Sequence, residues 1–329
     1  MFPHRKPCLE ARKAMSAAAL KLGSEACCAS RHEETRKAIR AISEVTKHRH
    51  VKLVSSGNAA ILAVLKGING RVMIPDQGGW KGFKSYPRLL GLEVCEVETN
   101  LGLIEPEVLG RAMEKHKPKA LLITSFAGYM AEQDVREISR VCKENEVLLI
   151  EDASGAIGDY KLADGSYADV IVCSTGAPKI LNVLNGGFIS TNNPEILGNA
   201  ADVIKACRVS PVTCAGIVEE LKNAGRTIKA LTRAAQLLKN ELRGIVHNDK
   251  RGICVGIELS GDAKKFAVKA REKGLKTEFG AALLTPCPAY ERFLKNGAAI
   301  ELKKLDILEM SEEKILEIAK ILKSMDINK

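Results

Sequence analysis

Three short segments of the 329-residue chain carry side chains whose types and spacing could do chemistry. The first, Ser55–Ala60, is a turn of small and polar residues that follows an apolar run. Small residues let the backbone approach a ligand, and the free N–H groups in the first turn of a helix bind phosphate well. Ser56 or Asn58 could equally be an ordinary helix N-cap, so this turn alone leaves both interpretations open.

The second segment, Leu149–Ala153, ends a strongly apolar run with two carboxylates. A buried strand rarely ends in an acid without a partner, because an unpaired buried charge is costly. Asp152 could therefore pair with a protonated ring nitrogen of a ligand. It could also cap the segment that follows, which would make it a structural residue.

The third segment runs from Cys173 to Lys179 and is followed by Gly186-Gly187. A lysine amine can act as a nucleophile toward a carbonyl group. Lys179 could instead be a solvated surface lysine, as most lysines of this chain are expected to be. Its place in a loop of small residues, at this spacing from the other two segments, favours a role in a site.

Short apolar runs alternate with helical stretches between residues 51 and 191, which predicts strands that alternate with helices. The predicted strands are Val51–Val54, Arg71–Pro75, Glu93–Val97, Ala120–Phe126, Val147–Glu151, Asp169–Cys173 and Gly187–Ser190. The helical stretches between them include Ala59–Lys66, Glu105–His116 and Val135–Asn145. This order favours an α/β fold with a mostly parallel seven-stranded sheet and helices on both faces. All three segments lie at the carboxyl ends of predicted strands, where ligands collect in such sheets.

Helical patterns also occupy both ends of the chain. The first 50 residues predict two amphipathic helices, Ala11–Leu22 and Glu33–Thr46. The elements predicted after residue 200 are helices at Ala215–Leu242, Ala263–Lys273 and Glu312–Lys323, a strand at Gly252–Leu259, and short strands at Leu275–Thr277 and Ala299–Leu302. The predicted division is an N-terminal helical segment (1–50), a large α/β domain (51–205) and a small α+β domain (206–329).

Together, the three segments resemble the DegT/DnrJ/EryC1/StrS aminotransferases, a family of fold-type I pyridoxal 5′-phosphate (PLP) enzymes. The family's Ser-Gly-Thr-Ala-Ala turn corresponds to Ser56–Ala60, and its Glu-Asp-Ala-Ala sequence to Glu151–Ser154. The family has a serine five residues before its lysine and a glycine pair after it. Here these are Ser174, Lys179 and Gly186-Gly187. The resemblance runs in register from about residue 50 to residue 191.

The resemblance implies that PLP forms a Schiff base with Lys179 and that Asp152 keeps the pyridine nitrogen protonated. These two are the predicted catalytic residues, and no metal is predicted. The predicted cofactor-binding residues are Ser56, Gly57, Asn58, Ala59, Trp80, Asp152, Ser174 and Lys179. The serines and the turn would hold the phosphate, and Trp80 would cover the ring. The implied protein is a homodimeric aminotransferase that acts on a small-molecule amino donor and acceptor.

Two features depart from the family pattern. The family commonly has Gln or His three residues after the aspartate, in contact with the cofactor region, whereas this chain has Gly155. The small domain matches no pattern that identifies a substrate-binding residue. Arg208 and Arg226 are candidates for binding a carboxylate, and the alternative is that each is a solvated arginine.

Other functions remain open. The same cofactor also serves lyases, desulfurases and selenocysteine-synthase-like enzymes that act on aminoacyl-tRNA. A non-catalytic relative is a third possibility, which Gly155 favours and the retained Lys179 and Asp152 oppose. A net charge of +10 is compatible with binding to nucleic acid. Aromatic residues make up only 4% of the chain, however, too few for a base-stacking surface.

The cysteines and the apolar runs predict a cytoplasmic protein. Four of the ten cysteines, Cys95, Cys142, Cys173 and Cys254, lie within or beside apolar runs, where a free thiol behaves as a small hydrophobe. No apolar run approaches the ~20 residues that span a bilayer, and no apolar segment that would form a signal peptide follows the N-terminal charges. A catalytic role for Cys8, Cys27 or Cys28 stays open.

Overall fold

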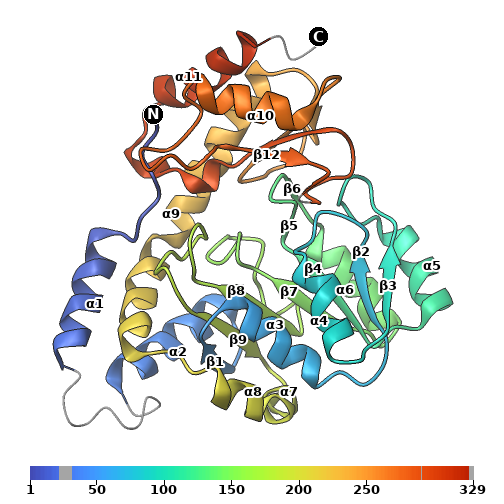
Figure 1. Cartoon of the computed structure of the whole chain (residues 1–329). Helices are drawn as coiled ribbons and strands as arrows, with labels where there is room; N and C mark the ends of the chain where they lie inside the picture. Colours follow the sequence, from blue (N-terminus) through green and yellow to red (C-terminus); the bar gives the residue numbers. More distant parts are fainter. Residues whose placement is uncertain (22–31, 290, 326–329) are drawn as a thin grey trace.

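The computed structural model describes residues 1–21, 32–289 and 291–325 (Figure 1). A seven-stranded sheet forms the centre of the larger part of the chain. Its strands in spatial order are β1 (His50–Val54), β9 (Gly187–Thr191), β8 (Val170–Ser174), β7 (Leu148–Asp152), β4 (Ala120–Thr124), β2 (Val72–Pro75) and β3 (Val94–Val97). Within this sheet β9 runs antiparallel to the other six strands. Each of the seven predicted runs forms one of these strands, so the predicted fold class is confirmed.

The central strand β4 shows why the sheet needs helices on both faces. All five of its residues are buried. Ala120 and Leu122 pack into the hydrophobic cluster on one face, while Leu121 and Ile123 pack into the cluster on the other. Because successive side chains of a strand point to opposite faces, an entirely apolar strand must be covered twice.

Two groups of helices provide this cover (Figure 1). On one face lie α3 (Gly57–Lys66), α4 (Gly82–Leu89), α7 (Pro194–Asn199) and α8 (Ala201–Ala206). On the other lie α2 (Glu33–Thr46), α5 (Pro106–His116), α6 (Val135–Glu144) and α9 (Pro211–Glu241). The helix α3 begins directly after β1, so its N-terminus lies at the carboxyl edge of the sheet. None of the described helices is both long and apolar enough to cross a bilayer.

The C-terminal part forms a smaller α+β unit that follows α9 (Figure 1). Its elements are the antiparallel sheet β10 (Ile245–Val246), β11 (Val255–Glu258), β13 (Gly297–Ile300) and β12 (Leu284–Cys287), with α10 (Ala263–Glu272), α11 (Glu312–Lys323) and the 3-10 turns η2 (Leu302–Lys304) and η3 (Ile307–Glu309). The strand predicted at Leu275–Thr277 is wrong, since this segment makes only isolated bridges. The strand β12 was missed because Pro286 interrupts its pattern, and proline cannot donate to a ladder hydrogen bond.

The N-terminal segment packs against its own chain. The helices α1 (Leu9–Lys21) and α2 both contact α9, and α2 buries Ala38 and Ile42. The residues before α1 cross to the C-terminal unit, where Phe2 is buried and forms a bridge with Thr277. Both N-terminal helices therefore bury apolar surface against α9 of their own chain.

The buried side chain of Glu151, in β7, connects the sheet to the segments that carry Ser125 and Ala163. Glu151 is fully buried and accepts hydrogen bonds from the Ser125 hydroxyl at 2.6 Å and the Ala163 amide at 3.1 Å, both at Oε1. Its Oε2 has no hydrogen-bond partner among the described residues. Burial raises the pKa of this carboxyl to about 7, since the two hydrogen bonds offset only part of the desolvation.

Glu151 should therefore make stability depend on pH. Because the folded-state pKa lies above the ordinary value of 4.5, stability is lost as pH rises from about 4.5 to about 7. Glu151→Gln removes this titration, so the unfolding free energy of the variant relative to wild type should increase by about 3 kcal/mol between pH 5 and pH 8. Urea unfolding of both proteins at these pH values measures the difference. A difference that does not change with pH would contradict a buried, protonated Glu151.

Candidate active site

The three predicted segments meet in one small cavity at the carboxyl edge of the sheet. Its volume is about 130 Å³. The lining residues are Ser56, Gly57, Asn58, Ile61, Trp80, Asp152, Ser154, Ser174 and Lys179. Every residue of the predicted site except Ala59 lines this cavity. The Ala59 side chain is buried inside α3, and its contribution is its amide, which donates to Ser56 Oγ at 3.0 Å.

The first turn of α3 is compatible with both interpretations of the Ser55–Ala60 segment, a helix N-cap and a phosphate site. Ser56 is the N-cap of the helix, as its hydrogen bond from Ala59 shows. The amides that precede Ala59 lie in the first turn, where N–H groups have no partner within the helix. A helix start of this kind attracts anions, so the cap and a phosphate site are compatible here.

The backbone at this edge is packed so closely that two glycines are required. A Cβ on Gly57 would lie 2.5 Å from the Ser174 Cβ and 2.9 Å from the Ser174 Cα. A Cβ on Gly187 would lie 2.6 Å from the carbonyl carbon of Ser56. Real Cβ contacts are not this short, so only glycine lets the end of β8 and the start of β9 touch the start of α3.

The end of β7 supplies a carboxylate that is held in place by a hydroxyl. Asp152 Oδ1 accepts hydrogen bonds from the Ser154 amide at 3.0 Å and from Ser154 Oγ at 2.5 Å. The same Ser154 Oγ accepts from the Ser174 amide at 2.8 Å. Ser154 thus ties the ends of β7 and β8 together. Sequence reasoning missed this role, although a hydroxyl two residues after the acid was a usable signal.

The amine of Lys179 stands over the cavity beside aromatic rings. Its Nζ donates to the Tyr129 hydroxyl and lies 5.9 Å from the centroid of the Trp80 ring. Burial alone would lower the pKa of this amine, but the contact with Tyr129 and the charge of Asp152 outweigh burial and raise it. Trp80 Nε1 in turn donates to Asn58 Oδ1 at 3.0 Å, which connects the ring to the α3 turn.

The loop that carries Lys179 is held in place by hydrogen bonds from a residue far away in the sequence. Arg5 is buried, and its guanidinium donates to the carbonyl oxygens of Lys179 at 3.0 Å and Ile180 at 2.5 Å. Glu220 of α9 lies 3.6 Å from the same guanidinium and pairs with its charge. Nothing in the local sequence around Arg5 indicates this role, because its partners lie more than 170 residues away.

Neither arginine proposed from the sequence lies at the cavity. Arg208 is exposed and donates to the carbonyl of Lys205 at 3.0 Å, while Arg226 lies on an exposed position of α9. Another arginine, Arg292, lies with its guanidinium carbon 4.8 Å from the centroid of the Tyr129 ring, whose hydroxyl contacts Lys179. The candidate carboxylate-binding role of Arg208 and Arg226 is therefore unsupported.

The N-terminal cysteines do not add to the site. Cys27 and Cys28 lie outside the described residues. Cys8 does not line the cavity, and its amide donates to Glu220 at 2.7 Å. Burial raises the pKa of the Cys8 thiol to about 11, so the thiol stays protonated at neutral pH and lacks the thiolate that a nucleophile requires.

A larger groove of about 600 Å³ lies near Tyr160 and Arg251, apart from the cavity residues. Arg251 is already paired, with Glu132 and with Asp159 at 3.0 Å. The groove lining includes amines, carboxylates and the start of α6, but no residue of the three predicted segments. The smaller cavity is the one that brings these three segments together.

The cavity supplies the groups that PLP requires. A helix start and serine hydroxyls suit its phosphate, and Asp152 suits its pyridine nitrogen. Lys179 provides the amine for its aldehyde, and Trp80 provides an apolar surface for its ring. A doubly covered, mostly parallel sheet with this site at its carboxyl edge defines the PLP-dependent transferases of fold type I.

Comparison with known families agrees with this class. The model of the DegT/DnrJ/EryC1/StrS aminotransferase family matches residues 19–210, more than half of the chain. A second model, the MJ1341 family C-terminal domain, matches residues 225–323. The chain therefore belongs to the DegT/DnrJ/EryC1/StrS aminotransferase family. This membership confirms the predicted family, the predicted class of PLP-dependent transferases and the predicted cofactor, PLP.

Individual relatives are distant. The UDP-4-amino-4,6-dideoxy-N-acetyl-β-L-altrosamine transaminase of Campylobacter jejuni is 25% identical over 214 residues, which cover 57% of this chain and 56% of the relative. The chain spans 41% to 64% of the length of four curated relatives that it matches.

Two solved structures share the fold at low sequence identity. The Helicobacter pylori aminotransferase PseC has a TM-score of 0.73 at 16% identity, with 98% of both chains covered. A variant of the serine palmitoyltransferase of S. paucimobilis, solved with a bound PLP–myriocin aldimine, has a TM-score of 0.74 at 14% identity, with 96% of this chain and 83% of that chain covered.

The contact between Gly57 and Ser174 gives a direct test of the cavity. Gly57→Ala should destabilise the protein by about 1–3 kcal/mol, the usual cost of overpacking, and should weaken PLP binding. Gly198→Ala is the matched control, since a Cβ on Gly198 would have nothing within 4 Å. Urea unfolding and a PLP titration measure the two effects. Equal behaviour of the two variants would rule out the close approach.

Proposed function

We propose that this chain is a PLP-dependent aminotransferase in which Lys179 binds the cofactor covalently through its ε-amine. The observation that carries the proposal is the position of this amine. It stands at the cavity that also holds Asp152, Trp80 and the start of α3. No other segment singled out from the sequence brings an amine and a carboxylate to the end of neighbouring strands.

Each lining residue has a defined task. When bound, PLP supplies an electron-accepting ring that stabilises negative charge on a substrate carbon. Asp152 holds a proton on the ring nitrogen, and its own position is fixed by Ser154. Ser174 and the first turn of α3 bind the phosphate, and Trp80 keeps water from one face of the ring. Lys179 moves a proton as general base and acid once its amine is free.

The names of the relatives support a carbonyl sugar as the amino acceptor. The Campylobacter jejuni relative is a transaminase of a UDP-linked amino sugar, and PseC is described as an aminotransferase involved in the biosynthesis of pseudoaminic acid. We therefore place a nucleotide-linked keto sugar first among acceptors, with a small amino acid as donor.

Reduction with borohydride tests the proposal. In PLP-loaded protein, the reduced cofactor should map by peptide mass spectrometry to Lys179. Lys66, an exposed lysine at the end of α3, is the internal control and should stay unlabelled. Label on another lysine, or none in a PLP-replete preparation, would reject the assignment. Asp152→Asn should keep the label at Lys179 but transfer amino groups orders of magnitude more slowly.

The products of a panel of amino donors distinguish the possible reactions. Aminotransfer predicts the keto acid of the donor together with an aminated acceptor. Loss of ammonia or sulfide without an acceptor would indicate a lyase or desulfurase, and turnover that requires aminoacyl-tRNA would indicate the selenocysteine-synthase-like reaction. A PLP-bound protein that turns over none of these would point to a binding function.

We further propose that the enzyme is a homodimer whose partner completes the cavity. The wall of the cavity is open on the side of Trp80, whose side chain is 39% exposed. A two-fold interface would close both sites at once. Sedimentation of the PLP-loaded protein at micromolar concentration should show a dimer. An active, PLP-bound monomer would refute the shared site.

A further inference from the structure

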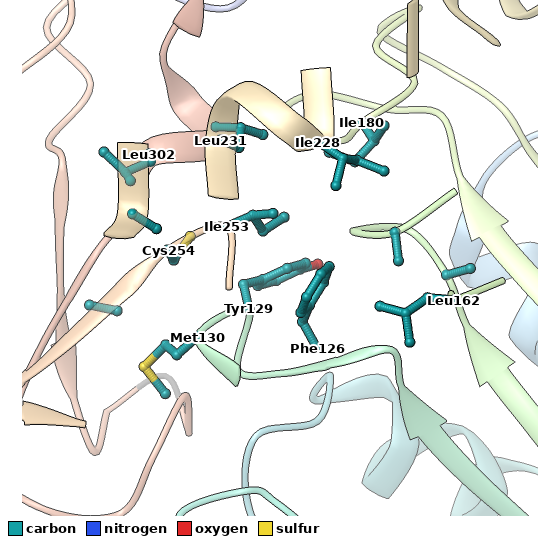
Figure 2. Close-up of a cluster of buried hydrophobic side chains, with 14 of the residues drawn as sticks. Phe126, Tyr129, Met130, Leu162, Ile180, Ile228, Leu231, Ile253, Cys254 and Leu302 are labelled. Carbon is teal, nitrogen blue, oxygen red and sulfur yellow. The ribbon is translucent and has the colours of Figure 1, made fainter. Parts of the chain in front are cut away.

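Tyr129 lies between Lys179 and the C-terminal unit, and the sequence alone predicts no role for it. It sits in the tight connection between β5 (Phe126–Ala127) and β6 (Ala131–Glu132). Figure 2 shows its ring beside Phe126, inside a buried cluster that also includes Ile253 and Leu302. Only 8% of Tyr129 is exposed, yet its hydroxyl reaches Lys179 Nζ.

The backbone of Tyr129 adopts a conformation that is costly for a large side chain. Its φ is +67°, and the preceding Gly128 also has a positive φ of +53°. A left-handed conformation costs roughly 1–2 kcal/mol for a residue with a Cβ. The Tyr129 carbonyl accepts two hydrogen bonds, from the amides of Ile253 and Cys254 at 2.9 Å each, which hold this conformation. Strain of this kind in a buried tyrosine indicates that the position of its side chain matters.

The Tyr129 ring occupies the space left by the departure at position 155. A Cβ on Gly155 would lie 2.9 Å from both Cδ1 and Cε1 of Tyr129. A larger residue three positions after Asp152 therefore cannot coexist with Tyr129 in this orientation. Gly155 and Tyr129 form one arrangement, in which an aromatic ring from the β5–β6 connection replaces a side chain from the end of β7.

Three basic side chains surround the ring, and burial lowers the pKa of one of them, Lys303, well below its ordinary value. The Lys303 Nζ lies 4.3 Å, the Lys179 Nζ 5.0 Å and the Arg292 guanidinium 4.8 Å from the ring centroid. Cations close to an aromatic ring are attracted by its electron density. The buried carboxylate of Glu301 pairs with Lys303 and also with Arg292, at 3.3 Å. The ring thereby connects Lys179 to residues of the C-terminal unit.

We propose that Tyr129 is a catalytic residue of this chain, whose hydroxyl holds the Lys179 amine in place and favours the protonated form of that amine. This role of Tyr129 rests on the proposed function in one respect, which is that Lys179 is taken as the reactive amine. The hydroxyl is the one side-chain oxygen that contacts Lys179 Nζ among the described residues. The ring cannot move toward β7, because it already packs against Gly155. It cannot move away either, because Lys303 and Arg292 lie against it. The amine is therefore held in one position at the cavity.

The reactivity of Lys179 in cofactor-free protein tests this role directly. Reductive methylation by formaldehyde and cyanoborohydride modifies only the neutral amine, and peptide mass spectrometry follows Lys179 against the exposed Lys66. Tyr129→Phe keeps the ring and removes the hydroxyl. Below the midpoint of the amine titration, Lys179 should then react about tenfold faster, the ratio expected from losing one hydrogen bond to a charged group. Its pH midpoint should move to lower pH.

Tyr160→Phe is the matched control. Tyr160 is exposed, and it also lies beside two cations, Arg251 at 4.8 Å and Lys161 at 5.6 Å from its ring centroid. It does not line the cavity, so the pH midpoint of Lys179 should stay at the wild-type value. A second variant, Gly155→Ala, keeps the hydroxyl but displaces the ring, and its pH midpoint should move in the same direction as in Tyr129→Phe.

An unchanged pH midpoint in Tyr129→Phe, or an equal shift in Tyr160→Phe, would overturn the proposal. The assay needs neither PLP nor an amino substrate, so its outcome is separate from the proposed function. If borohydride places PLP on Lys179 but Tyr129→Phe leaves the midpoint unchanged, only the role of Tyr129 fails. If the midpoint shifts but PLP binds elsewhere, the contact between Tyr129 and the Lys179 amine stands, whereas the catalytic role of Tyr129 fails together with the proposed function.

Discussion

The contact between the start of α3 and the ends of β8 and β9 is the constraint on which the site depends. Three backbone segments meet there without room for a Cβ at Gly57 or Gly187. Because these segments touch, Ser56 and Ser174 come to the same cavity, and Lys179 is carried to its edge five residues later. The phosphate end and the amine end of a cofactor site are thus set by one packing contact between backbones.

Electrostatic pairing then fixes the polar groups that this contact brings together. Ser154 joins Asp152 to the backbone of Ser174, so the carboxylate cannot turn away from the cavity. Around the amine, the balance is different, because Lys303 and Arg292 lie against the Tyr129 ring and share the buried carboxylate of Glu301. Burial lowers the pKa of Lys303 well below its ordinary value, which reduces the positive charge on this side of the ring.

The sequence predicted the sheet and most of the site because both depend on local patterns. Apolar runs such as Ala120–Thr124 define strands by composition alone, and the small-residue turns follow them directly. The missed residues act across long sequence separations. Arg5 contacts a loop more than 170 residues away, and Tyr129 meets Lys303 only after the C-terminal unit has packed. From the sequence alone, Gly155 is only a missing side chain, whereas in the structure the Tyr129 ring occupies the space beside it. No local pattern encodes contacts of this kind.

The link from Arg5 to the Lys179 loop also bears on the order in which the protein is completed during synthesis. Arg5 leaves the ribosome long before its partners, the carbonyls of Lys179 and Ile180 and the carboxylate of Glu220. Its own amide donates to Lys304, which emerges later still. A large sheet can form while translation continues, since domains fold as units. The lysine loop, in contrast, is locked only after residues as late as Lys304 have been made, so nascent chains carry an unfinished site.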